Sequence, residues 1–223
     1  MEERTTSEVT ERTTREVQAV YDEIAEHFSK TRAYSWPEVE DFLEEFAGGR
    51  RGLDIGCGNG RHTEHLAAYC DVVYGLDLSR ELLYEADARV VSDADITWMQ
   101  GDAGVLPVQD GSIDTAIYVA TIHHLPDRET RVESLRELGR VLTADGIGLV
   151  SAWSTAHDRF DADADATMGF DTTVDWTLPG GETVPRFYHI YAPAEFERDI
   201  RAAGLSVNSF GISSGNCYAR VRK

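Results

Sequence analysis

The stretch that decides the fold is Asp54-Ile55-Gly56-Cys57-Gly58-Asn59-Gly60, a glycine-rich loop between a predicted strand (51–55) and a predicted helix (63–69). Glycines at alternate positions allow a tight turn and let backbone N–H groups approach a ligand at the N-terminus of the helix. A lone glycine loop is also compatible with a simple tight turn, so the surrounding pattern must decide between the two interpretations.

The chain around this loop alternates between strands and helices. Amphipathic helices are predicted from Glu16 and from Pro37, and further helices at 79–88, 128–142 and 193–203. Strands are predicted at 71–76, 96–100, 113–120 and 147–153, and segments 205–210 and 217–222 can pair as a closing antiparallel hairpin. This order predicts an α/β, Rossmann-like, doubly wound and mostly parallel sheet with a closing antiparallel strand.

Two segments do not fit the alternation. Residues 1–15 are polar, rich in Thr and Glu, and expected to be disordered, which leaves 16–223 as a single domain. Residues 154–185 are rich in Asp, Thr and Gly and are interpreted as an acidic insertion, either a solvated loop or a lid that orders over substrate. Asp161, Asp163 and Asp165 lack the glycine and glutamate of a calcium-binding EF-hand loop.

Charge is the unusual feature of the composition. The 223 residues carry a net charge of −19, and the only lysines are Lys30 and Lys223. Acidic residues spread through the chain favour adaptation to high salt over a cationic partner, so the charge does not exclude a nucleic-acid substrate. No apolar run approaches the ~20 residues of a membrane span, and we expect a soluble, cytoplasmic protein. Three scattered cysteines predict neither a disulfide framework nor a zinc site.

The loop itself separates two classes of cofactor. Arg61 occupies the position of the third glycine in the dinucleotide fingerprint G-x-G-x-x-G. The acid-plus-glycine pattern instead resembles the first motif of the class I S-adenosylmethionine-dependent methyltransferases, in which the acid helps to hold the ammonium group of the cofactor. Asp77 and Asp102, each after a predicted strand, suit the ribose hydroxyls and the adenine amine. The predicted cofactor residues are Tyr21, Asp54, Gly56, Cys57, Gly58, Asp77, Leu78, Asp102, Ala103 and Ala120.

A narrower resemblance runs through most of the chain. Residues 20–32 (VYDEIAEHFSKTR) followed by Trp36-Pro37 look like the opening of the tRNA wobble-uridine methyltransferases, namely tRNA methyltransferase 9 and the methyltransferase domain of AlkB homologue 8. The segments Ile122-His123-His124, Arg186-Phe187-Tyr188-His189 and Gly215-Asn216-Cys217 also resemble that family. The resemblance implies esterification of the carboxylate of 5-carboxymethyluridine, or a related modified uridine, in tRNA.

This reaction needs alignment more than proton transfer, because a carboxylate is already ionised at neutral pH. An arginine can fork onto both carboxylate oxygens, and Arg32 and Arg186 are the candidates. His123 and His124 follow the fourth predicted strand, and either they face the methyl group or they pack beneath the cofactor and cap a helix. His189 is expected to contact the flipped base or to lie on the surface. The predicted catalytic residues are Arg32, His123, His124, Arg186 and His189.

A partner follows from the expected strand order. The third predicted strand lies at an edge of the sheet, and its apolar residues Ile96, Trp98 and Met99 suit strand addition by another chain, unless Trp98 packs under a neighbouring helix. The resemblance implies a small zinc-binding activator subunit that supplies its own zinc. Arginines near the ligand edge are expected to contact phosphates of the tRNA, unless neighbouring acids pair with these arginines. They are Arg61, Arg128, Arg131 and Arg186.

Two other functions stay open at this point. A small-molecule or quinone-type methyltransferase has a similar glycine loop and paired histidines, whereas the two ends of the chain favour the tRNA enzymes. The second function is that of a catalytically silent subunit that binds the cofactor. The complete set of loop glycines and acids does not exclude this function.

Overall fold

The structure is a computed structural model that describes residues 6–90, 94–160 and 166–223. Its seven-stranded sheet has the order β3-β2-β1-β4-β5-β9-β8. The strands are β1 (Arg51–Ile55), β2 (Val72–Asp77), β3 (Asp95–Gln100), β4 (Ile113–Val119), β5 (Leu142–Trp153), β8 (Ser206–Ser213) and β9 (Asn216–Arg222). The first five are parallel, and β9 pairs antiparallel with both β5 and β8. The predicted fold class is confirmed.

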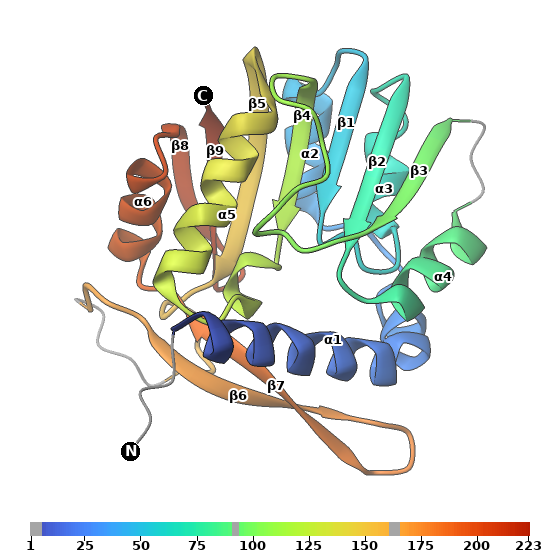
Figure 1. Cartoon of the computed structure of the whole chain (residues 1–223), viewed down its shortest axis with the longest axis vertical. Coiled ribbons are helices and arrows are strands. Elements are labelled where there is room, and N and C mark those ends of the chain that lie inside the picture. The colour runs from blue at the N-terminus through green and yellow to red at the C-terminus, as the bar shows by residue number, and fades with distance from the viewer. Residues whose placement is uncertain (1–5, 91–93, 161–165) are drawn as a thin grey trace.

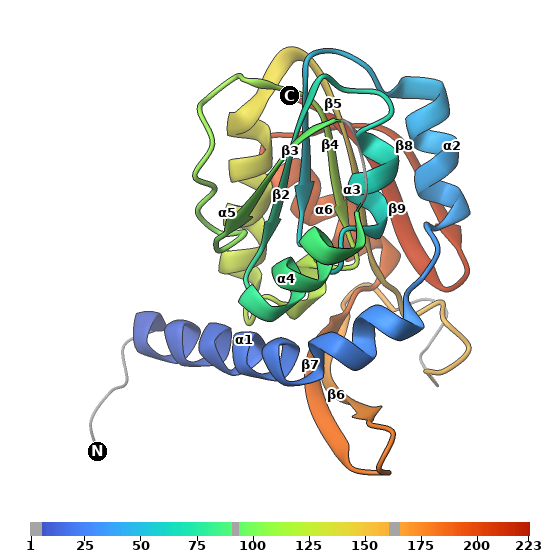
Figure 2. The same cartoon turned by 90° about the vertical axis from the view of Figure 1, so that its right-hand side faces the viewer.

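Helices cover both faces of this sheet, as a parallel sheet requires (Figures 1 and 2). On one face, α5 (Arg128–Val141) and α6 (Pro193–Ala202) bury Leu135, Leu138, Phe196 and Ile200. On the other, α2 (Pro37–Phe46) and α3 (Arg61–Leu66) bury Val39, Phe42, Leu43 and Leu66. Helix α4 (Arg80–Arg89) follows β2, and Oγ of Ser79 caps it by accepting from the Leu82 N–H at 3.1 Å, as predicted.

Helix α1 (Thr6–Thr31) runs across the carboxyl ends of the parallel strands, where the loops after β1, β2 and β4 converge (Figure 1). It begins ten residues before the predicted start at Glu16, and it contacts α4 and β7. The helix therefore roofs the edge of the sheet at which ligands bind in this architecture. Within the described ranges, no helix is both long and apolar enough to cross a lipid bilayer.

The segment predicted as an acidic insertion is largely a two-stranded ribbon. Strands β6 (Phe170–Thr177) and β7 (Thr183–Ile190) pair antiparallel and project beyond α1 (Figure 2). The expectation of a solvated loop is wrong for this part, because side chains at every second position are buried: Val174, Trp176, Val184, Arg186 and Tyr188. The aspartates at 161, 163 and 165 lie outside the described residues.

Candidate functional site

The glycine loop has the conformation that its sequence predicts. Gly56, Gly58 and Gly60 all have positive φ, between 55° and 75°. A Cβ at Gly56 would lie 2.1 Å from Oγ1 of Thr121, which follows β4, and a Cβ at Gly60 would lie 2.9 Å from the Trp98 ring. These glycines are therefore needed both for the left-handed backbone and for close packing. The loop is held between β2, the end of β4 and the edge strand β3.

Two predicted acids lie at this loop, with different surroundings. Asp54 is 2% exposed and accepts from Oγ1 of Thr63 at 2.6 Å. Burial raises the pKa of Asp54 to about 7, against the opposing effect of the Thr63 hydrogen bond. Asp77 accepts from the backbone N–H groups of Gly58 (2.8 Å) and Ser79 (2.9 Å), and burial nevertheless raises its pKa to about 6. Asp77 thus ties the loop to the end of β2.

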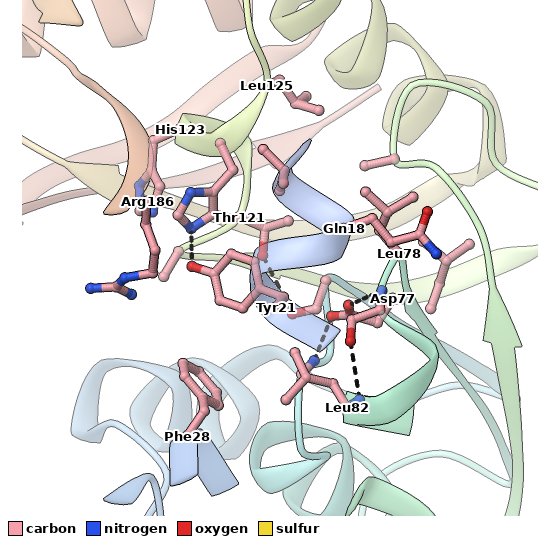
Figure 3. Close-up of a pocket in the computed structure, with 18 of the residues that line it drawn as sticks. Gln18, Tyr21, Phe28, Asp77, Leu78, Leu82, Thr121, His123, Leu125 and Arg186 are labelled. Carbon is pink, nitrogen blue, oxygen red and sulfur yellow. Dashed lines mark hydrogen bonds between the residues drawn. The ribbon is translucent and has the colours of Figure 1, made fainter. Parts of the chain in front are cut away.

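A pocket opens between this loop and the roof formed by α1 (Figure 3). Its wall combines apolar side chains with a few polar groups, as a small-molecule site does. Twelve of the fifteen predicted site residues line it: Tyr21, Arg32, Gly56, Gly58, Asp77, Leu78, Asp102, Ala103, Ala120, His123, His124 and Arg186. Ala120 has a φ of 54°, a strained conformation for a residue with a side chain.

Three predicted residues are not part of the pocket wall. Asp54 lies behind the loop on Thr63, and Cys57 is buried with its sulfur close to Gly75. The prediction that His189 contacts the flipped base is wrong. Its Nδ1 lies 2.7 Å from Oδ1 of Asp171 and its Nε2 lies 3.3 Å from Oε1 of Glu195, and the residue is 5% exposed. His189 fastens the ribbon to α6 instead.

The paired histidines lie on a short 3-10 turn, η1 (Ile122–His124), after β4. Nδ1 of His124 is 2.9 Å from the carbonyl oxygen of Phe187, which can only accept, so this nitrogen carries a proton. Burial lowers the pKa of His124 to about 3, so the ring is neutral and its Nε2 accepts from the Tyr21 hydroxyl at 2.8 Å. The dashed line from the Tyr21 oxygen in Figure 3 marks this bond.

His123 has the opposite tautomer. Its Nδ1 accepts from the backbone N–H of Trp153 at 3.1 Å, and burial holds its pKa well below the usual range. The proton of the neutral ring is therefore on Nε2. Neither histidine caps the next helix, whose N-cap is Asp127. Both rings are held by backbone hydrogen bonds, and both side chains line the pocket.

Two guanidinium groups lie close to one indole ring. The Cζ of Arg32 lies 5.1 Å and that of Arg186 lies 4.9 Å from the ring centroid of Trp176, which is within the range of cation–π attraction. Arg186 is 7% exposed, and its Nε has no hydrogen-bond partner among the described residues. Burial and the charge of Arg186 lower the pKa of Arg32. Both arginines are therefore arranged to receive an anion.

The remaining arginines predicted to contact phosphates have different surroundings. Nε of Arg128 lies 2.8 Å from Oδ1 of the buried Asp199. Arg131 is 3% exposed and donates to the carbonyl oxygen of Leu125. For Arg128 the alternative of pairing with an acid holds. For Arg131 the phosphate prediction is wrong, because the side chain is buried. Arg61 lines the pocket beside the ring of Trp36.

Sequence reasoning missed two aromatic residues of the ribbon, namely Tyr188, which lines the pocket, and Trp176, which packs against Arg32 and Arg186. Tyr188 packs on both histidine rings and stacks on Trp153 at 4.9 Å. The signal was present as alternation along two short strands, Val174-x-Trp176 and Val184-x-Arg186-x-Tyr188. The surrounding acids and glycines obscured this pattern.

The predicted edge strand is confirmed, since β3 ends the sheet order. Trp98 is not a free docking side chain, however. A Cβ at Gly75 would lie 2.4 Å from its ring, which also lies against Gly60, Ala86 and Val90. Ile96 and Met99 pack partly against the two core clusters. Any partner at this edge must therefore use the backbone of β3 and its exposed positions, such as Thr97.

Comparisons with known proteins agree with this geometry. A family model described as a methyltransferase domain matches residues 53–150. A putative methyltransferase of Encephalitozoon cuniculi is 30% identical over 210 residues, covering 93% of this chain and 95% of that protein. The tRNA (carboxymethyluridine(34)-5-O)-methyltransferase of Schizosaccharomyces pombe is 28% identical over 231 residues, with 93% and 96% covered.

Other relatives are longer. The mouse tRNA (carboxymethyluridine(34)-5-O)-methyltransferase ALKBH8 is 37% identical over 147 residues, which are 64% of this chain and 20% of that protein. The chain thus spans only a minor part of that relative. Among solved structures, the complex between the Haloferax volcanii Trm112 methyltransferase activator and a putative methyltransferase aligns with a TM-score of 0.68 at 17% identity, covering 92% of this chain and 96% of that chain. This last likeness concerns the fold.

Proposed function

Since the chain belongs to the class I S-adenosylmethionine-dependent methyltransferases, we propose that it esterifies the carboxylate of 5-carboxymethyluridine, or of a related modified uridine, at the tRNA wobble position. The relatives of mouse and fission yeast that carry this activity in their names support the substrate. The observation that carries the proposal is the pair Arg32 and Arg186 on Trp176, beside two neutral histidines.

The pocket fits the cofactor by its donor and acceptor chemistry. Asp77 ends β2 and Asp102 follows the adjacent strand β3, so one carboxylate can accept from ribose hydroxyls and the other from the adenine amine, and Leu78 and Leu82 add apolar wall. Gly58 has a left-handed backbone and no side chain, so the space between it and Phe28 is open to the methionine portion of the cofactor. When bound, S-adenosylmethionine supplies an electrophilic methyl group on a sulfonium sulfur.

The remaining residues suit an acceptor that is already charged. The two histidines that line the pocket are weak bases, because burial lowers the pKa of both, and each has one nitrogen committed to the backbone. A carboxylate acceptor with an ordinary pKa of about 4 needs no base at pH 7. Arg186 and Arg32 orient its oxygens, and the aromatic walls Tyr188 and Trp153 exclude water.

We also propose that a small zinc-binding activator protein adds to the β3 edge of the sheet. Support comes from the exposed edge strand and from the similarly folded Haloferax volcanii methyltransferase that was solved with the Trm112 activator. An edge strand presents unpaired backbone groups that a partner strand can satisfy.

The substrate proposal is tested by mass spectrometry of nucleosides from tRNA. We expect a strain lacking this protein to lose the methyl ester of the wobble uridine and to accumulate the free acid. The purified protein, with its partner, should restore the ester on that tRNA with S-adenosylmethionine. Unchanged ester in the deletion strain would refute the proposal.

A further inference from the structure

The loop that joins α1 to α2 displays the most exposed large hydrophobic side chain of the described residues. Tyr34 is 86% exposed, whereas the other exposed tyrosines, Tyr69 and Tyr84, reach 38% and 52%. The ring is therefore free to stack on a partner that reaches this loop, and tyrosine combines an apolar face with a polar tip that suits such contacts.

The backbone that carries this ring is held from three sides. Nδ2 of Asn59 donates to the carbonyl oxygen of Arg32 at 3.0 Å, Arg89 donates to that of Ala33 at 2.5 Å, and Arg61 donates to that of Tyr34 at 3.4 Å. Three successive carbonyl groups are thus tied to the glycine loop, α3 and α4. A loop fixed in this way presents its side chain with little further loss of entropy on binding.

The same loop forms the rim of the pocket. Arg32 and Trp36, on either side of Tyr34, both line the pocket, as does Arg61. The guanidinium of Arg61 lies 5.0 Å from the centre of the Trp36 ring, and its pKa is lowered to about 10 by burial and by the neighbouring Arg32. The positive group of Arg61 therefore contacts the backbone that carries the exposed ring, in a chain whose net charge is −19.

The acids around this rim are few among the described residues. The carboxylate of Glu64 lies 3.9 Å from Arg89, at the limit of an ion pair, and no carboxylate of residues 6–90, 94–160 and 166–223 lies within ion-pair distance of Arg32 or Arg61. An exposed aromatic ring beside unpaired guanidinium groups is the combination with which proteins bind single-stranded nucleic acid: the ring stacks on a base and the cations meet the backbone phosphates.

We propose that Tyr34 is the stacking platform for the nucleotide that adjoins the methylated uridine in the anticodon loop, with Arg61 beside its phosphate. This inference rests on the proposed function and adds how the RNA is held at the pocket entrance. The target base enters the pocket past Arg32, and its neighbour stays outside on the Tyr34 ring.

The test measures binding of an RNA hairpin that carries carboxymethyluridine at the target position, together with methylation by the full chain and its partner. We expect Tyr34→Ala to weaken RNA binding about tenfold, within the range of one lost base stack, and to leave the KM for S-adenosylmethionine unchanged. Tyr34→Trp should retain binding. Tyr69→Ala is the matched control, since Tyr69 is exposed just before β2, at the amino ends of the parallel strands, whereas the pocket lies at their carboxyl ends.

A hairpin with an abasic residue next to the target uridine identifies the contact. Removing the correct base should weaken binding to the wild-type protein and have no further effect on Tyr34→Ala. If the wild-type protein binds and methylates the hairpin and Tyr34→Ala does so equally well, the platform is refuted while the proposed function stands. If the wild-type protein with its partner neither binds nor methylates this RNA, the proposed function fails first, and the platform with it.

Discussion

The hydroxyl of Tyr21, on α1, donates to Nε2 of His124, on the turn after β4, across a separation of 103 residues in sequence and 2.8 Å in space. The carbonyl oxygen of Phe187 fixes the tautomer of His124 from the other side. This chain of hydrogen bonds joins the roof, the end of the sheet and the ribbon at the centre of the pocket. It also fixes the direction of the Tyr21 proton, so that the free lone pairs of its oxygen face away from His124.

We expect His124 to act as a positioning residue rather than as a base. Because burial lowers its pKa to about 3, the ring is neutral at every pH between 6 and 8.5. At saturating cofactor and RNA, kcat should therefore be flat over this range. A decrease of kcat as the pH falls through about 6.5 that disappears in His124→Asn would show that this histidine titrates in the reaction. A decrease that the variant retains would belong to Asp54 or Asp77, whose pKa values are about 7 and about 6.

Variants of Tyr21 and His124 give a second prediction about this hydrogen bond. His124→Asn and Tyr21→Phe each remove the bond, and we expect each to lower kcat by about tenfold, the equivalent of roughly 1.4 kcal/mol, with little added loss in the double variant. Full additivity of the two losses would mean that the residues act independently. Circular dichroism and thermal unfolding control for misfolding.

A third prediction concerns Asp54 and stability. Its pKa is about 7 in the folded chain and about 3.8 when unfolded, so the folded state holds the proton more tightly. Stability from this group is fully present below pH 3.8 and is lost as the pH rises toward 7. Asp54→Asn removes the ionisable carboxyl group and therefore the loss of stability at higher pH. It should stabilise the cofactor-free protein more at pH 8 than at pH 5, with a difference on the order of 2 kcal/mol.

Chemical denaturation at the two pH values measures this difference. Asp71→Asn is the control, because Asp71 is exposed just before β2. Equal effects of Asp54→Asn at pH 5 and pH 8 would contradict a raised pKa. The variant should also bind S-adenosylmethionine more weakly if the carboxylate contributes to holding the ammonium group.

The fold was predictable because each sequence pattern that indicates it lies within a short stretch of the chain. Strand, glycine loop and helix follow one another within 20 residues around Gly56, and the order of elements then fixes a parallel sheet with β3 at its edge. The pocket was predictable where residues end a strand, as with Asp77 and Asp102. The ribbon was not, because the burial of Trp176 and Arg186 depends on α1, which lies some 150 residues earlier in the chain. His189 resembles a site residue in sequence, and only Asp171 and Glu195 reveal its structural role.

The fourth prediction compares two glycines with left-handed backbones. Gly56→Ala places a Cβ 2.1 Å from Oγ1 of Thr121, whereas Gly111→Ala, at a φ of 59°, meets no atom within 4 Å. Both variants carry the conformational cost of about 1 kcal/mol, and only Gly56→Ala adds a clash. We expect it to abolish measurable binding of S-adenosylhomocysteine in calorimetry, with Gly111→Ala binding normally. Normal binding by Gly56→Ala would show that the loop adapts.

The last prediction tests the β3 edge. Trp98→Glu is a poor probe, because its ring packs on Gly60 and Gly75 and the change would disturb the cofactor loop. Thr97→Lys is better, since Thr97 is exposed in the middle of β3 and a charged side chain blocks strand addition. Ser206→Lys, exposed on the opposite edge strand β8, is the matched control. We expect Thr97→Lys to weaken co-purification with the activator by at least tenfold while S-adenosylhomocysteine binding is retained. Loss of the complex in Ser206→Lys alone would place the partner on the β8 edge.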